Sequence, residues 1–473
     1  MMLDMIENPK LIQGGMGVGI SNWELARAVA LSGEKRGESV LGVVSGTGLP
    51  LIMVNRMQRR DPDAIRALEA FDPIIAKEIF DEYLPPEGAI LKRYKIPPKP
   101  EVLVNGTPEI KAKMNRLAVA AAFSEVWLAK KGHSGQIGIN LLEKIQLMAL
   151  PTILGAMIAG VDKVLVGAGI PNQIPDVIDN FHQNQHASYR ADIRGSKEKL
   201  ILTLDPKDFG LVEGDLARPD FYAIISHHLL AMLLRKNDGV NGYIVEGPLA
   251  GGHNAPARDK EVDAKGQPVY GERDKPDMDV IMKQGKPVWL AGAYAGKLRE
   301  AKALGAVGVQ VGTAFALSNE SGISADAKNL MRDRVKKGEL EVLTSAVASP
   351  TGFPLQLVQL EGSLTDPEVY IGRKRVCNAG YLVEARGLDE KGNMVFACPA
   401  EPLKAYIRKG GKEDETVNRM CICNGSSASS GYGQDGEPRM FTLGKDLSPV
   451  EDLLTQNPDG YTADDVVGYV FSS

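Results

Sequence analysis

Cysteine and histidine are both scarce in this chain, which has four cysteines and six histidines among its 473 residues. So few cysteines exclude a fold held together by disulfides. Acidic residues outnumber basic ones by 60 to 55, and the resulting net charge of −5 offers no positive field to attract nucleic acid or an anionic membrane. Hydrophobic residues make up 44% of the chain, which is the composition of a globular protein and not of a disordered one.

Long hydrophobic runs are also missing. The longest, Leu147 to Val161, has 15 residues and contains Pro151, whereas a membrane-spanning helix needs about 20 apolar residues. The first nine residues include acidic side chains and show no basic segment followed by an apolar block, so no signal peptide is expected. These absences predict a cytoplasmic protein with no membrane partner.

What the chain does have is a regular alternation of short apolar runs and amphipathic segments over its first 316 residues. Several runs are apolar at consecutive positions, as expected for strands that are buried on both faces. The alternation predicts an α/β fold, and eight runs favour a (β/α)₈ TIM barrel over an open doubly wound sheet. The predicted strands are Leu11–Met16, Val40–Ser45, Gln136–Asn140, Lys163–Gly167, Leu200–Leu204, Gly242–Glu246, Val288–Ala291 and Gly308–Val311.

Three segments interrupt or end this alternation. Residues 81–113 are rich in proline and lysine and are predicted to be an insertion after the second barrel strand. Residues 254–287 hold 14 charged residues in 34, which indicates a solvated loop before the seventh strand. The sequence thus predicts a barrel over residues 1–345 and a loop-rich, cysteine-containing extension over 346–473 that packs on it.

Glycine-rich segments follow five of the predicted strands. In a barrel, the loops after the strands line the mouth, and those after the last two strands frequently hold phosphate. Gly292 opens a helix, and Gly312-Thr313 adds a backbone N–H and a hydroxyl, so both segments suit an anion. Ser21 and Glu24 have the spacing of a capping box that opens the first helix. Together the segments favour a ligand that bears a phosphate.

One histidine is placed for chemistry. His253 follows a glycine pair at a predicted strand end, where its side chain would face the mouth. An imidazole there can hold or take a proton near neutral pH. The other five are expected in helices or loops: His133, His182, His186, His227 and His228.

Five motifs, in order between residues 11 and 316, resemble the nitronate monooxygenase (2-nitropropane dioxygenase-like) family. The FMN-dependent enoyl-acyl-carrier-protein reductases of the same superfamily look similar through these motifs. They are Leu-Ile-Gln-Gly-Gly-Met-Gly-Val, Val-Ser-Gly-Thr, Ile-Gly-Ile-Asn, Val-Glu-Gly-Pro-Leu-Ala-Gly-Gly-His and Gly-Val-Gln-Val-Gly-Thr-Ala-Phe.

The resemblance implies that FMN lies across the barrel mouth and that His253 is the catalytic residue. It implies a cofactor site in three parts. Along the flavin ring and at its polar edge it places Gly14, Gly15, Met16, Ser45 and Asn140. Beside the ribityl chain and ring it places Glu246, Ala250, Gly251 and Gly252. At the phosphate it places Gly292, Gly312 and Thr313.

The four cysteines all fall within 47 residues near the end of the chain: Cys377, Cys398, Cys421 and Cys423. Four thiolates can close a zinc site or ligate an iron–sulfur cluster. The spacing lacks the paired Cys-x₂-Cys of strong zinc motifs, so four reduced thiols and a disulfide are the alternatives.

Three functions follow from these observations. The first is an FMN-dependent oxidoreductase that oxidises a nitronate or a similar small carbanion with O₂. The second is an enoyl-thioester reductase that uses NAD(P)H, and the third is a non-catalytic protein that binds flavin or docks a partner. The partners expected are a small-molecule substrate and O₂ or NAD(P)H, with a homo-oligomer as an open possibility. The sequence leaves the substrate, the electron donor and the oligomeric state open.

Overall fold

The computed structural model describes residues 8–433 and 436–473 and contains a closed barrel of eight parallel strands. Around the barrel the strand order is β1-β11-β10-β8-β7-β4-β3-β2, and β1 pairs with both β11 and β2. The predicted (β/α)₈ barrel is therefore confirmed. Its strands are β1 Leu11–Gln13, β2 Val40–Ser45, β3 Gln136–Leu142, β4 Lys163–Gly167, β7 Asp220–Ile225, β8 Gly242–Glu246, β10 Val288–Ala291 and β11 Gly308–Val311.

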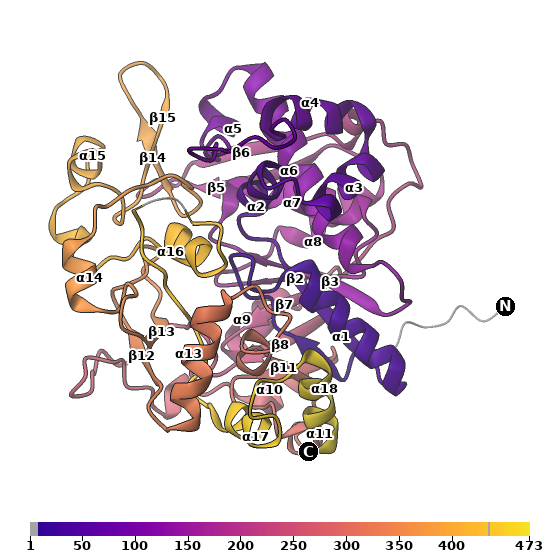
Figure 1. Ribbon diagram of the computed structural model, residues 1–473, viewed down its shortest axis with the longest axis vertical. Helices are drawn as coiled ribbons and strands as arrows, with labels where there is room; N and C mark the ends of the chain where they lie inside the picture. The colour runs from indigo at the N-terminus through magenta and orange to yellow at the C-terminus, as the bar shows by residue number, and fades with distance from the viewer. Residues whose placement is uncertain (1–7, 434–435) are drawn as a thin grey trace.

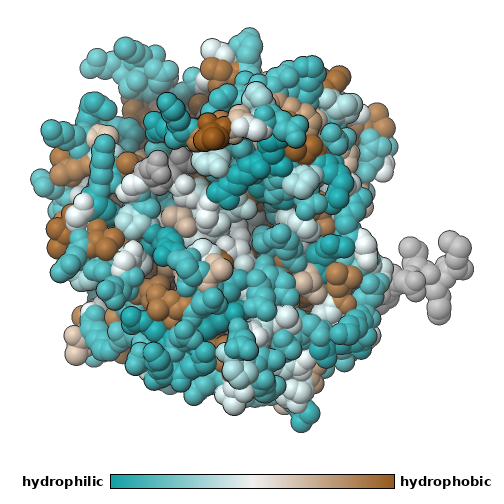
Figure 2. Space-filling model, in the orientation of Figure 1, coloured by the Kyte–Doolittle hydropathy of each residue, from teal (hydrophilic) through white to brown (hydrophobic). Residues whose placement is uncertain are grey.

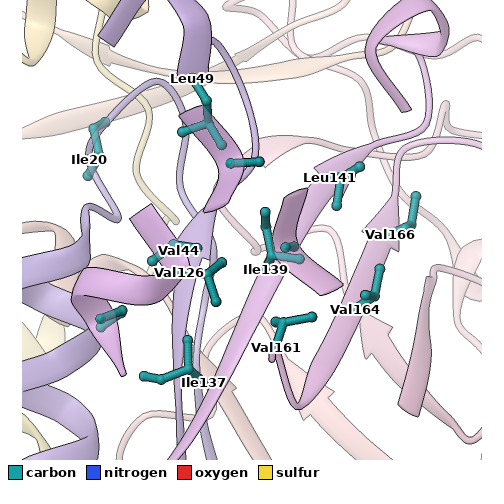
Figure 3. Close-up of a cluster of buried hydrophobic side chains, with 14 of the residues drawn as sticks. Ile20, Val44, Leu49, Val126, Ile137, Ile139, Leu141, Val161, Val164 and Val166 are labelled. Carbon is teal, nitrogen blue, oxygen red and sulfur yellow. The ribbon is translucent and has the colours of Figure 1, made fainter. Parts of the chain in front are cut away.

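Helices surround this barrel (Figure 1). After the strands come α1 Trp23–Arg36, α2 Leu49–Gln58, α7 Ala149–Ile158, α8 Ile174–His182, α9 His228–Leu234, α10 Met278–Met282, α11 Leu298–Ala303 and α12 Thr313–Ala316. The helix-facing side chains of the strands include Val44, Ile139 and Val164, all fully buried (Figure 3). Burial of each such side chain contributes about 1.5–3 kcal/mol to folding.

A second layer of side chains fills the inside of the barrel. It includes Leu41, Leu165, Tyr222 and Trp289, none of which is exposed. The rings of Tyr222 and Trp289 lie 4.5 Å apart, and the Trp289 indole N–H donates to the carbonyl of Pro9 at 2.6 Å. The barrel is thus a packed core, and a ligand has room only at its mouth.

One predicted barrel strand was wrong. Leu200–Leu204 lies in β6 Lys199–Leu204, which pairs antiparallel with β5 Ala187–Asp192 in a hairpin outside the barrel. The fifth barrel strand is β7, which follows it. The two strands differ in burial, because β6 buries only two of its six residues, whereas β7 buries five consecutive ones, as a strand covered on both faces must.

The predicted insertion after the second barrel strand includes a stretch, residues 84–101, without a helix or strand. The helices α3 Pro62–Phe71 and α4 Pro73–Tyr83 precede this stretch, and α5 Val102–Asn105 and the long α6 Pro108–Ala129 follow it. Proline at the first or second position of three of these helices, α3, α4 and α6, suits the helix start, where its missing N–H costs nothing.

The chain after the barrel contains more regular structure than a loop-rich segment suggests. Its elements are α13 Ala325–Lys336, β12 Glu341–Ser345, β13 Leu355–Gln359, α14 Pro367–Gly372, β14 Glu384–Leu388, β15 Met394–Ala397, α15 Leu403–Arg408, α16 Ile422–Ser429, α17 Ser448–Gln456 and α18 Ala463–Ser472. The helix α18 returns to the start of the chain and lies beside α1 (Figure 1), where Asp464 accepts from Ser32 Oγ at 2.6 Å and from Arg36 Nε at 3.0 Å.

A small sheet joins this C-terminal part to the barrel. Strand β13 pairs antiparallel with β12 and with β9 Gly252–His253, which belongs to the loop after β8. The predicted domain boundary at residues 345 and 346 stays a prediction, and it falls between the paired strands β12 and β13. This sheet also holds the predicted catalytic histidine in place, because His253 lies in β9 and pairs with Leu355 of β13.

The helices and the surface show two further properties of the molecule. Among residues 8–433 and 436–473, no helix has both the length and the apolar composition needed to cross a bilayer. The face in Figure 2 is mostly hydrophilic, and its hydrophobic residues lie in small separate groups.

Candidate active site

A cavity of about 260 Å³ lies at the carboxyl ends of the barrel strands. Residues that were predicted from separate parts of the sequence meet around it. Those lining it are Gly14, Gly15, Met16, Asn140, Glu246, Ala250, Gly251, Gly252, His253, Gly292, Gly312 and Thr313. Ser45 is the exception, because it lines a separate small cavity with Arg56 and Glu125.

The loop after β1 is fixed by two polar side chains that the sequence analysis did not place in the site. Ser21 Oγ donates to the carbonyl of Gly14 at 2.9 Å and accepts from the N–H of Met16 at 2.8 Å. Gln13 Nε2 donates to the same hydroxyl at 2.8 Å. Ser21 is not the helix cap predicted for it, since Asn22 caps α1 by accepting from the N–H of Leu25. A serine with a glutamine eight residues before it gave no recognisable sequence signal.

Two of the glycines around the cavity, Gly15 and Gly292, show why a side chain would not fit there. A Cβ on Gly15 would lie 2.2 Å from the Cβ of Asn140, so any side chain there would displace the asparagine. At Gly292 the backbone has φ of 80°, and a Cβ would lie 2.9 Å from the backbone N of Ala250. These glycines let the backbone of neighbouring strand ends approach closely.

Two buried oxygens facing the site have no hydrogen-bond partner among the described residues, Asn140 Oδ1 and Gln310 Oε1. The amide nitrogens of both residues are used, since Asn140 Nδ2 donates to the carbonyl of Gly15 at 3.2 Å and Gln310 Nε2 donates to Glu246 Oε1 at 3.3 Å. An unsatisfied buried acceptor costs about 1–3 kcal/mol. A ligand with N–H or O–H donors would remove that cost, and a flavin carries both.

Glu246 and His253 are two titratable side chains in the lining of the cavity, and burial shifts the pKa of each. Burial raises the pKa of Glu246 to about 7, against a smaller opposing effect of the Gln310 hydrogen bond. Burial lowers the pKa of His253 to about 4. At neutral pH the imidazole is therefore uncharged, whereas Glu246 is divided between its acid and its carboxylate.

His253 owes its position to the C-terminal part of the chain. Its backbone pairs with Leu355 in β13, and its Nε2 lies 2.8 Å from the hydroxyl of Ser349. That hydroxyl lies 2.7 Å from Oγ1 of Thr351. Neither hydroxyl residue was predicted, because nothing in the sequence links residue 253 to a segment almost a hundred positions later.

The same extension closes the cavity on another side. The N–H of Gly444 donates to Oγ1 of Thr313 at 2.8 Å, and the N–H of Lys445 donates to the carbonyl of Leu249 at 3.1 Å. A Cβ on Gly251 would lie 2.9 Å from the backbone N of Gly444. Further C-terminal residues that line the cavity are Tyr381, Leu382, Ile422, Cys423, Ser426, Thr442 and Leu443.

The four cysteines come together in space but not as a metal centre. All four line one small cavity of about 10 Å³, and all four are free thiols. Among the described residues, no group of three or more His, Cys, Asp or Glu side chains is placed to hold a metal ion, so the predicted zinc or iron–sulfur site is not supported. Cys398 and Cys421 pack against Ala400 as small hydrophobic side chains, and burial raises the pKa of both thiols.

Comparison with known proteins gives structural similarities only. No protein-family model and no curated protein matches the sequence. Solved structures do match, and three of them are each aligned over 98% of this chain. A mutant of FabK from Thermotoga maritima is 14% identical, with 91% of that chain covered and a TM-score of 0.43. A nitroalkane oxidase from Streptomyces ansochromogenes is 14% identical, with 95% covered and a TM-score of 0.44.

The third is the enoyl reductase domain of MlnA from Bacillus amyloliquefaciens, which is 10% identical, with 94% covered and a TM-score of 0.45. The chain is a (β/α)₈ barrel. That assignment rests on its own closed ring of parallel strands.

Proposed function

We propose that this protein is an FMN-dependent oxidoreductase that oxidises a nitronate or a similar small carbanion with O₂. The observation that carries the proposal is the convergence of motifs from separate strand ends on one cavity that also holds His253 and Glu246. Nothing in the barrel architecture alone requires a titratable pair there.

The residues around the cavity suit FMN. Gly14, Gly15 and Met16 would lie along the ring, and Asn140 and Gln310 would supply acceptors to its donors. Gly292, Gly312 and Thr313 would hold the phosphate. When bound, FMN supplies the redox chemistry, and the protein supplies orientation and proton handling.

His253 has a role that fits an anionic substrate. A nitronate arrives already ionised, so the site has no need of a strong base. A neutral imidazole can donate a hydrogen bond to the anion, and a lowered pKa keeps it in that form. Ser349 fixes the ring by its contact with Nε2.

The second candidate function, NAD(P)H-dependent reduction of an enoyl thioester, is favoured by Glu246. Such a reduction needs a proton donor beside the substrate. A carboxyl with a pKa of about 7 is partly protonated at neutral pH and can give up that proton. His253, with a pKa of about 4, is already in its neutral form and has no acidic proton to donate.

Anaerobic mixing of the flavin-loaded protein with propionate 3-nitronate, NADH or NADPH tests the two candidates. Bleaching of the flavin by the nitronate alone supports the oxidase. Bleaching by a pyridine nucleotide supports the reductase, and no bleaching by any of them contradicts both.

A further inference from the structure

The cavity that would hold FMN has acidic side chains in its lining but no fixed positive charge. Glu246 and Asp446 both line it, and among the residues that the structure describes no lysine or arginine does. His253 supplies no charge at neutral pH, because burial lowers the pKa of its imidazole to about 4. The side chain of Lys445 is engaged outside this lining, since its Nζ donates to Gln267 Oε1 at 2.9 Å.

Glu246 lies beside the loops that would hold the phosphate. In the barrel, Glu246 of β8 and Gln310 of β11 are each paired in register with Ala291 of β10. Within this row the side-chain amide of Gln310 donates to Glu246 Oε1 at 3.3 Å. Gly292 follows Ala291 directly, and Gly312 comes two residues after Gln310. The carboxyl of Glu246 is therefore on the last row of the barrel before both phosphate loops.

Asp446 lies near the same loops but belongs to the C-terminal part of the chain. Two residues before it, the N–H of Gly444 donates to Thr313 Oγ1 at 2.8 Å. The carboxylate of Asp446 accepts from the N–H of Ser448 at 3.2 Å and from its hydroxyl at 2.6 Å. These donors are neutral, so they do not cancel its negative charge.

A flavin phosphate would add negative charge to this acidic lining. A phosphate ester carries a charge of about −1.5 to −2 at pH 7. Backbone N–H groups can bind it, but a nearby like charge favours the protonated form of a carboxyl. Glu246 is the acid prepared to take a proton, because burial already raises its pKa to about 7.

On its other side Glu246 lines a second, smaller cavity of about 150 Å³. The charged and titratable groups that line it with Glu246 and the imidazole described above are His227, Arg258, Tyr270 and Asp274. Arg258 and Asp274 carry opposite charges, and the backbone N–H of Arg258 donates to Asp274 Oδ1 at 2.9 Å. This side therefore offers Glu246 little net positive charge to offset the phosphate.

We propose that the protein takes up a proton from solvent when FMN binds, and that the carboxyl of Glu246 holds this proton beside the phosphate loops. Glu246 then has no negative charge in the loaded protein, and its acid form can donate a hydrogen bond within the cavity. The inference rests on FMN as the cofactor of the proposed function, but not on which reaction the protein catalyses.

The pH dependence of FMN affinity tests this coupling. Because the loaded protein would hold more protons than the free protein, binding must weaken as the pH rises. Dilution of the flavin-loaded protein, followed by the fluorescence of released FMN, should show a dissociation constant that rises about three- to tenfold per pH unit between pH 7 and 8.5. In Glu246→Gln it should change less than about twofold over this range. Glu261→Gln, which alters an exposed acid on the loop after β8, should behave as wild type.

Proton counting tests the same coupling without a variant. FMN is titrated calorimetrically into the flavin-stripped full chain at pH 8, in two buffers that differ in ionisation enthalpy. About 0.5–0.9 proton should be taken up per FMN, and clearly less per riboflavin, which lacks the phosphate. No uptake with FMN, equal uptake with riboflavin, or the same pH dependence in wild type and Glu246→Gln would overturn the proposal.

The outcomes separate this proposal from the proposed function. A protein that binds FMN with the expected proton uptake but oxidises no nitronate supports the coupling and contradicts the oxidase. A protein that oxidises the nitronate but binds FMN equally well at pH 7 and 8.5 contradicts the coupling alone. Failure to bind FMN at either pH contradicts both.

Discussion

The imidazole of His253 lies 2.8 Å from the hydroxyl of Ser349, so a side chain from beyond the barrel contacts the predicted catalytic histidine. The two residues are brought together by the pairing of β9 with β13. The C-terminal part of the chain is thus a component of the candidate site.

Replacement of the histidine tests its role directly. His253→Ala should keep its FMN, because the cofactor would rest on glycine backbone, and should lose turnover by roughly 10²–10⁴. The loss should be smaller for a nitronate supplied as the anion than for a neutral nitroalkane, which must first be deprotonated. The measurements are flavin content and steady-state rates. A variant that turns over both substrates within about threefold of wild type would remove His253 from the mechanism.

Ser349 should behave as a positioning residue. Ser349→Ala removes the contact with His253 Nε2 and should lower turnover by roughly 3–10-fold, the worth of one neutral hydrogen bond. Ser349→Thr, which retains the hydroxyl, should restore most of the rate. If both variants lose flavin instead of rate, the contact serves folding and not catalysis.

Glu246 should make the stability of the flavin-free protein depend on pH. The folded-state pKa is raised from 4.5 to about 7, so the folded state holds the proton more tightly than the unfolded state. Its contribution is present below pH 4.5 and is lost as pH rises through 7, by up to about 3 kcal/mol. Glu246→Gln should remove that dependence, as measured by urea unfolding at pH 5 and pH 8. The same slope in both proteins would show that Glu246 titrates normally.

Gly15 should tolerate no side chain. In Gly15→Ala the new Cβ would lie 2.2 Å from that of Asn140, and the required shift should cost about 1–3 kcal/mol and most of the bound flavin. Gly372→Ala is a matched control, because a Cβ there meets nothing within 4 Å. Thermal unfolding and flavin absorbance measure both effects. Full flavin content in Gly15→Ala would show that the cavity is not the flavin site.

The cysteines should react as buried thiols. Cys398 and Cys421 are 8% exposed, so a thiol reagent should modify them slowly in native protein, and four thiols should be counted after unfolding. Elemental analysis completes the measurement. Stoichiometric zinc, or iron with sulfide, would restore the metal site that the geometry does not support.

The sequence by itself determined the barrel and most of the cavity wall. Seven of the eight strands were predicted because buried parallel strands require consecutive apolar residues, a pattern that is local in the chain. The error at Leu200–Leu204 has the same origin, since a short apolar run does not reveal whether its far side is covered by helices or by water. The glycine motifs could be recognised in the sequence because each one reports a local backbone requirement, and the structure places their glycines around one cavity.

Only the tertiary structure decided which distant groups complete the site. Ser349 reaches His253, and Gly444 reaches Thr313, through pairings between segments about 100 or more residues apart. Ser45, which belongs to a strand-end motif, faces a different cavity, because the direction of a side chain depends on the packing around it. A second, smaller cavity lies against Glu246 and His253 because part of the charged loop after β8 packs beside them. Such contacts depend on how the whole chain packs, so they cannot be predicted from a local pattern of residues.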